Sequence, residues 1–308
     1  MSYNRRNFIG DSIAISAASF LPTLNVFGTS KAHSPAAAEG FVLKIMAPYW
    51  GFNGSVTGFC KKAKQDGYDG IEILWSAEIA KELFAALKEY RLEVGFLCRG
   101  DEPVFESHFA TFKKVLNEAI NNNLQKPLYI NVHSGKDFFK YQENKKFIDF
   151  TILYAKQTGV AIYHETHRSR MLYSAPASRV YLEENPGLRL TLDISHWCNV
   201  SESLLEDQPE TVNLAISRTD HVHSRVGHAE GPQVSDPRAP EWKPAVEAHF
   251  VWWDKIVAIK KQEGKMLTML TEFGPPTYMP TLPFTNVPVS DQWAINVYMM
   301  QTWRKRYL

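Results

Sequence analysis

The segment VAIYHETHRSR, residues 160–170, decides the fold of this chain. It opens with residues typical of a buried strand and ends in a group of ionisable side chains. The stretch before it, FIDFTILYAKQTG (147–159), has helical spacing and ends in a glycine, as many helices do. A helix that leads into a short buried strand is a unit of α/β proteins. The fold therefore depends on whether this unit repeats.

The alternation of helix and strand continues along the whole chain after about residue 40. Short apolar stretches rich in β-branched and aromatic residues predict eight strands, at 41–50, 68–75, 92–98, 127–135, 160–166, 189–197, 220–227 and 266–274. Helical spacing predicts helices that include 56–67, 77–91, 108–123, 147–159, 242–264 and 290–308. Eight alternations without a linker predict a single (β/α)8 TIM barrel. The alternative is an open doubly wound sheet, but APYWGFNGS (47–55) lacks the GxGxxG spacing of its phosphate turn.

The composition is that of a globular chain with a large core. Of 308 residues, 44% are hydrophobic, and the formal charge is +1 with acids and bases interspersed. This charge pattern gives no electrostatic footprint for nucleic acid or anionic lipid. Cys60, Cys98 and Cys198 are widely spaced and odd in number, so we expect buried thiols rather than disulfides or a thiolate zinc site.

The first 38 residues are expected to form an export signal and linker, with the barrel at 39–308. Arg5 and Arg6 precede a weakly apolar run and then a stretch rich in small residues, and RRNF resembles the core of a twin-arginine signal. This predicts a periplasmic or exported protein that does not associate with a membrane after the signal is removed. The alternative is a frayed amino-terminal helix with two incidental arginines, in which case the protein would be cytoplasmic.

Polar residues at the carboxyl ends of barrel strands are candidates for chemistry, because TIM-barrel active sites are built there. In the last four predicted strands these residues are Glu165, Asp193, His223 and Glu272. Two like charges about 4 Å apart repel by roughly 1 to 4 kcal/mol at the surface and in water, and a divalent cation would remove that repulsion. Three oxygens and one nitrogen favour manganese, with magnesium, cobalt or zinc as alternatives. A lone strand-end glutamate is commonly a salt-bridge or helix-cap partner, so this interpretation rests on all four residues.

Side chains alternate along a strand, and this decides which residues share the barrel interior. Glu165 shares its face with Tyr163 and His167. On the seventh strand His221 would lie one layer deeper than His223. We therefore expect His223 to be a ligand and His221 to support it.

From about residue 41 to 305 the sequence resembles the xylose isomerase-like TIM barrels, the sugar isomerase and epimerase superfamily that also contains endonuclease-type members. The motifs that carry the resemblance are YDGIEILW with Glu72, INVHSG with His133, YHETH with Glu165, LDISHW with Asp193 and His196, HVHSR with His223, and LTEFG with Glu272. The resemblance implies that Glu165, Asp193, His223 and Glu272 hold the metal. It also implies that the two glutamates act as the acid and base pair and that His196 contacts a substrate hydroxyl or carbonyl.

The expected function is a divalent-metal-dependent isomerase or epimerase acting on a sugar or keto-sugar. The metal would hold a carbonyl oxygen and the neighbouring hydroxyl and stabilise the enediolate formed by proton loss. Glu165 would take the proton and Glu272 would return it. The expected partner is a small sugar rather than a nucleic acid, and homo-oligomerisation is left open.

Specificity is expected from side chains around the barrel mouth. Besides His196, Glu72 and His133, these are Trp50, Trp75, Trp197, His167, Arg168, Arg170 and Arg225. Aromatic faces stack on sugars, although most tryptophans of a barrel belong to its core. The basic group at 167–170 suits a carboxylate or a phosphate, and equally suits a solvated face or a salt bridge. Export would favour free sugars, 3-keto-glucosides or sugar acids over phosphorylated sugars.

The segment VGHAEGPQVSDPRAPEW (226–242) is expected to fold over the mouth as a substrate loop. In the sugar epimerases that this sequence resembles, the arginine after the metal histidine falls at a different spacing, which leaves the substrate open.

Three other functions are compatible with such a barrel. The first is a lyase or hydrolase acting on an oxidised (3-keto) glycoside, because the same enediolate also serves β-elimination. The second is an apurinic endonuclease, which would need more histidines for a zinc cluster and a basic face for DNA. The third is a non-catalytic sugar-binding protein, which the intact ligand set disfavours.

Overall fold

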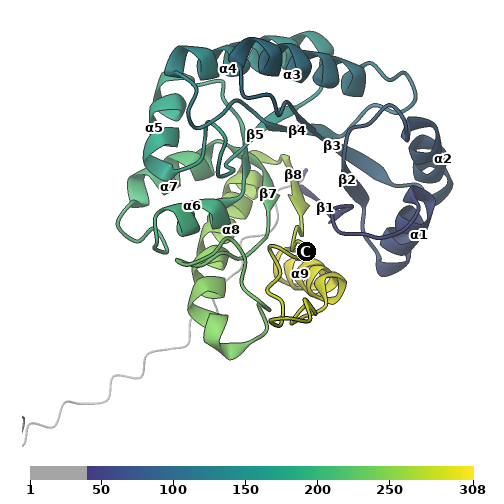
Figure 1. The fold of residues 1–308 in the computed structure, drawn as a ribbon, viewed down its shortest axis with the longest axis vertical. Coiled ribbons are helices and arrows are strands. Elements are labelled where there is room, and N and C mark those ends of the chain that lie inside the picture. Colours follow the sequence, from purple (N-terminus) through teal and green to yellow (C-terminus); the bar gives the residue numbers. More distant parts are fainter. Residues whose placement is uncertain (1–39) are drawn as a thin grey trace, which may run out of the picture. The chain divides into compact units, whose positions relative to one another are not determined.

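The structure, a computed structural model, describes residues 40–308, which form a closed barrel of eight parallel strands with helices outside it (Figure 1). Each strand pairs with the next one in the sequence, and the eighth pairs with the first. The predicted (β/α)8 fold is therefore confirmed. The predicted export signal lies outside the described residues. Within the described part of the chain, no helix has both the length and the apolar character needed to cross a membrane.

The strands are β1 (Val42–Pro48), β2 (Gly70–Leu74), β3 (Glu93–Arg99), β4 (Tyr129–His133), β5 (Ile162–Glu165), β6 (Leu190–Leu192), β7 (Thr219–His223) and β8 (Met266–Leu270). The helices are α1 (Val56–Asp66), α2 (Ala80–Tyr90), α3 (Phe105–Ile120), α4 (Tyr141–Thr158), α5 (Ala175–Glu184), α6 (Ile194–Val200), α7 (Pro209–Ser217), the 3-10 helix η1 (Pro240–Trp242), α8 (Lys243–Glu263) and α9 (Gln292–Tyr307).

The helix ends follow local sequence signals. Ser55 caps α1 by accepting a hydrogen bond from the Gly58 amide at 3.0 Å. Gly67, Gly159 and Gly264 end α1, α4 and α8 with φ of 95°, 65° and 60°. Such left-handed backbone favours glycine, which is why these residues terminate the helices as the sequence predicts.

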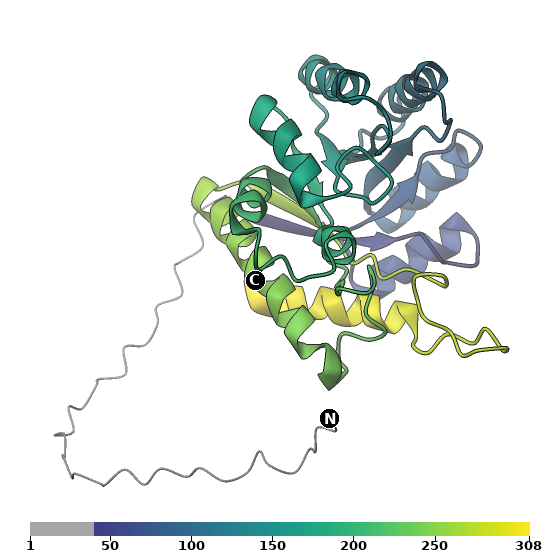
Figure 2. The same ribbon diagram turned by 60° about the vertical axis from the view of Figure 1, so that its left-hand side comes forward.

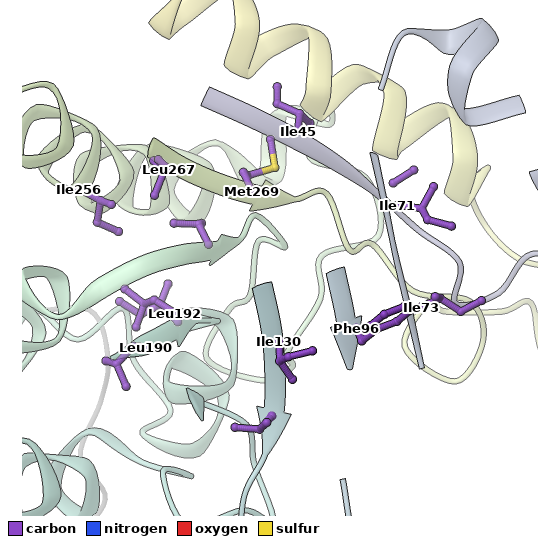
Figure 3. Packing of buried hydrophobic residues seen from close by; sticks show 14 of the residues in the cluster. Ile45, Ile71, Ile73, Phe96, Ile130, Leu190, Leu192, Ile256, Leu267 and Met269 are labelled. Atoms are coloured by element: carbon purple, nitrogen blue, oxygen red, sulfur yellow. The ribbon is translucent and has the colours of Figure 1, made fainter. Parts of the chain in front are cut away.

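The main core lies between the barrel wall and the helices (Figure 3). Ile71 and Ile73 belong to it, whereas Glu72 between them faces the interior and accepts a hydrogen bond from Tyr129. The barrel interior holds a small apolar cluster around Tyr129 and is otherwise largely polar. Alternation along each strand therefore separates the packing residues outside from the polar residues inside.

Several sequence predictions need correction here. The expected strand 189–197 ends at Leu192, and ISHW is the start of α6, because the Asp193 side chain caps that helix by accepting from the Ser195 amide at 3.1 Å. Trp75 packs against Phe84 and Phe96 in the core, and Trp197 is fully buried with its indole N–H donating to the Leu172 carbonyl. Neither tryptophan reaches the mouth. The three cysteines are buried and free, as expected.

Candidate active site

Four acidic and imidazole side chains converge where four consecutive strands end. Glu165 ends β5, Asp193 follows β6, His223 ends β7, and Glu272 follows β8. Each offers one ligand atom, and these atoms all lie within 4.8 Å of one another. The structure thus brings together the four residues that the sequence singles out. We call them the ligand cluster.

Three residues of the ligand cluster, Glu165, His223 and Glu272, face each other with atoms that lack hydrogen-bond partners. His223 Nδ1 lies 2.7 Å from Glu272 Oε2 and 3.8 Å from Glu165 Oε1, yet none of these three buried atoms forms a hydrogen bond. Buried polar atoms are almost always satisfied, so orphaned atoms that point at a common centre need an explanation. A divalent cation bound by three carboxylate oxygens and one imidazole nitrogen satisfies all of them. The residues present therefore fit a metal.

Burial and mutual charge determine the pKa values in the cluster. Burial raises the pKa of Asp193 to about 7. Burial would also raise the pKa of Glu165, but the neighbouring His133 and His223 hold it well below its ordinary value. Burial would lower the pKa of His223, but the carboxylates of Glu272 and Glu165 raise it well above its ordinary value. In the absence of metal, a protonated His223 would partly balance the acids.

Arg225 supplies a further positive charge. Its side chain is 1% exposed, and Nη2 donates to Asp193 Oδ2 and to His196 Nε2, the latter at 2.8 Å. The same nitrogen lies 3.7 Å from Glu272 Oε2. Because His196 Nε2 accepts this bond, the buried ring of His196 is neutral, in line with the burial that lowers its pKa. The guanidinium also lies 4.7 Å above the ring of Tyr278.

A hydrogen-bonded layer beneath the cluster orients Glu165. Asn131 and His133 of β4 donate to Glu165 Oε2 at 2.6 and 2.9 Å, which leaves Oε1 free for the centre of the cluster. Glu72 lies in the same layer, where His221 Nε2 is 3.4 Å from Oε2. Burial would raise the pKa of Glu72, but the imidazoles of His221 and His223, 3.4 and 3.7 Å from its oxygens, lower it strongly. His221 therefore lies below His223, as alternation predicts.

Glu272 stands in backbone that non-glycine residues seldom adopt, with φ of 44°. The amides that follow it are held by distant side chains. Asn296 of α9 accepts from the Phe273 amide at 2.8 Å, and Gln233 accepts from the Gly274 amide at 2.7 Å. These bonds stabilise the turn that aims the Glu272 carboxylate, whose side chain is 14% exposed.

A cavity of about 740 Å³ opens above the cluster. Of the predicted site residues, it is lined by Trp50, Glu72, His133, His167, Arg170, Arg225 and Glu272. Glu165, Asp193, His196 and His223 are buried and are not among its lining residues. No residue of the predicted substrate loop 226–242 lines this cavity; Gln233 of this segment instead bonds to both backbone groups of Gly274, in the turn that follows Glu272. That expectation was wrong.

The basic group at 167–170 separates into three environments. The His167 ring lies between the rings of His133 and His196, with centroids 4.5 and 4.1 Å away, and burial lowers its pKa well below the ordinary value. Arg168 lies 4.9 Å above the ring of Tyr278. Arg170 donates to the Gly100 carbonyl and to Asp101, each at 2.9 Å, so the salt-bridge interpretation holds for this residue.

Three residues of the site were missed by sequence reasoning. Asn131 has no feature in YINVH that marks it as functional. It is two residues from His133 and therefore shares the inward face of the strand, which could have identified it. Arg99 follows the predicted third strand and shares the face of Leu97, and both line the cavity. Tyr278 comes from the long loop between β8 and α9 (Figure 2), and nothing local in the sequence indicates that its ring meets the rings of Trp50 and His196.

Comparisons with known proteins concern the fold. No protein-family model matches this chain, and a search of curated proteins finds no significant match. The probable 3-DHS dehydratase AsbF from Bacillus anthracis is similar over 86% of this chain and 100% of its own, with 17% identity and a TM-score of 0.55. A D-psicose 3-epimerase structure determined in the presence of D-fructose is similar over 85% and 98%, with 11% identity and a TM-score of 0.54. Endonuclease IV from Thermus thermophilus is similar over 86% and 99%, with 14% identity and a TM-score of 0.51. At such identities the chain shares a barrel fold with these enzymes, and the resemblance to xylose isomerase-like barrels is supported at the level of the fold.

Proposed function

We propose that this chain is a divalent-metal-dependent enzyme that isomerises or epimerises a sugar or keto-sugar by proton transfer. One observation carries the proposal. Three orphaned buried atoms of Glu165, His223 and Glu272, with Asp193 beside them, surround a common point beneath a cavity of about 740 Å³. The donor set favours manganese, with magnesium, cobalt or zinc as alternatives.

When bound, the cation supplies a Lewis acid that stabilises negative charge developing on a substrate oxygen. The chain supplies the proton transfers. Glu165 is held at Oε2 by Asn131 and His133, so its other oxygen has a defined direction as a base. Glu272 reaches the same centre from β8 and borders the cavity, which suits it to return the proton from another side. Such an exchange between two faces is what an epimerase requires.

Polar side chains around the cavity would orient the substrate. His133, His167 and Arg225 border the cavity next to the cluster and can bind hydroxyl or carbonyl oxygens. The ring of Trp50, 41% exposed at the rim, offers a face for the C–H surface of a sugar. His196 would act through Arg225, since it accepts a hydrogen bond from that guanidinium and is fully buried.

The test is solvent deuterium incorporation into keto-sugars, followed by NMR with the manganese-loaded protein. We expect Glu165→Gln and Glu272→Gln to lose exchange while keeping the fold. Glu247→Gln, an exposed glutamate of α8, is the matched control and should keep it. Substantial deuterium exchange in both active-site variants would contradict the proposed proton transfer. The same spectra separate isomerisation from β-elimination, because elimination splits the substrate.

We also propose that the protein is exported through the twin-arginine signal. Cell fractionation of wild type and a variant with Arg5 and Arg6 replaced by lysine tests this. Equal amounts outside the cytoplasm in both would contradict it.

A further inference from the structure

The wall of the cavity on the β3 side carries an arginine that the proposed chemistry does not use. Arg99 is the last residue of β3 and lies in register with His133 of β4. Both residues border the cavity, and His133 Nε2 contacts the base Glu165 at 2.9 Å. Neighbouring strands lie about 4.8 Å apart, so the strand of Arg99 runs roughly 10 Å from that of Glu165. Arg99 and Glu165 therefore belong to strands that are two positions apart in the barrel wall.

The guanidinium of Arg99 has hydrogen-bond donors that no protein group uses in the described part of the chain. Its Nε lies 3.0 Å from Asp101 Oδ2, and its side chain is 39% exposed. Neither terminal nitrogen has a protein acceptor among the residues that the structure describes. A guanidinium held at Nε by one carboxylate still presents its two terminal NH2 groups, the part that binds planar oxyanions in pairs.

Two further cations lie near Arg99. Arg170 borders the cavity, is anchored on Gly100 and Asp101, and keeps Asp101 in place. Lys136, in the loop after β4, has no acidic group within 4.0 Å in the described part of the chain. Burial lowers the pKa of Lys136, and the nearby Arg170 and Arg99 add to that effect. The carboxylates of Asp101 and Asp137 act on Lys136 in the opposite direction, so three cations stand beside two carboxylates and one positive charge is left unmatched.

From this placement we propose that Arg99 binds an anionic group at the end of the substrate remote from the reacting carbons, while Lys136, which does not border the cavity, adds positive charge from nearby. This inference rests on the proposed function and narrows its substrate class to sugar acids or sugar phosphates. The carboxylate or phosphate would occupy the free donors of Arg99, while the metal end of the cavity holds the carbonyl and hydroxyl. A neutral sugar would leave this excess charge unmatched.

The experiment is calorimetric binding of D-glucose, D-gluconate and D-glucose 6-phosphate to the manganese-loaded protein. We expect at least one anion to bind about 10-fold or more tightly than glucose, and to lose about 10-fold or more in Arg99→Met, as befits a charge-assisted pair. Lys136→Met should lose less. Arg179→Met is the matched control, because Arg179 is also surface-exposed and ion-paired but lies on α5, and it should bind like wild type.

If gluconate binds more tightly than glucose, the anionic group is a carboxylate. If glucose 6-phosphate does, it is a phosphate. Equal affinities for glucose and both anions, no detectable binding of either anion, or unchanged anion binding in Arg99→Met would each overturn the inference. Since binding rather than turnover is measured, failure of the proposed proton transfer appears separately, as absence of deuterium exchange with intact anion selectivity.

Discussion

Replacing Arg225 by methionine tests how the charge of the ligand cluster is balanced. In the described part of the chain, the Arg225 guanidinium is the only arginine or lysine group within 4 Å of Asp193, and both side chains are almost fully buried. Removing one partner of a buried ion pair typically costs about 3–5 kcal/mol, because the remaining charge is left uncompensated. We expect the metal-free variant to lose about that much unfolding free energy.

Bound metal should restore most of the lost unfolding free energy, because the cation supplies the positive charge that Asp193 loses with Arg225. The assay is urea unfolding of wild type and Arg225→Met, in excess EDTA and with saturating Mn²⁺. Arg189→Met is the control, because the Arg189–Asp220 pair also contacts Lys260 and does not involve the cluster. Its deficit should be the same with and without Mn²⁺. If the loss of unfolding free energy in Arg225→Met is equally insensitive to Mn²⁺, the metal does not balance the charge of Asp193.

Three further predictions concern other parts of the structure. His249 is fully buried and accepts from the Gly227 amide, and burial lowers its pKa to about 4. The stabilisation of the folded state by neutral His249 is complete above the ordinary pKa of about 6.5 and decreases by up to about 3 kcal/mol as pH falls towards 4. The unfolding free energy of His249→Gln, measured in urea, should therefore depend less on pH than that of wild type. Tyr278→Ala removes the ring beside Arg225 and should raise KM about 10-fold with little change in thermal stability; unchanged steady-state kinetics would contradict this. Trp253→Ala should cost about 3–5 kcal/mol in urea unfolding, because this side chain is completely buried, and a loss below about 1 kcal/mol would contradict the packing.

The fold and the ligand cluster could be predicted because both depend on periodicity. Alternation along a strand places Glu165 inward whatever its neighbours are, and successive strand ends of a closed barrel must meet at one rim. The sequence therefore predicted the convergence of Glu165, Asp193, His223 and Glu272. Boundaries were less accurate, since the Asp193 cap turns the chain into α6 where the apolar run suggested more strand.

The rim could not be predicted to the same extent, because its contacts join segments far apart in the sequence. Tyr278 meets Arg168 and Arg225 only through the path of the loop after β8. Trp75 is of a residue type that commonly binds sugars at a barrel mouth. Its position on the outer face of the barrel nevertheless places it in the core. Single-residue chemistry is therefore visible in the sequence, whereas the partners of a loop residue are set by tertiary packing.

We propose that the ligand cluster holds one divalent cation on which proton transfer depends. The most direct measurement titrates chelator-stripped protein with Mn²⁺ and follows deuterium incorporation into a keto-sugar by NMR. We expect no exchange without metal and exchange that rises to a plateau at one equivalent of Mn²⁺ per chain. The Asp193→Asn variant should need far more Mn²⁺ to reach this plateau. Exchange at full rate in the stripped protein, or an Asp193→Asn titration identical to that of wild type, would contradict it.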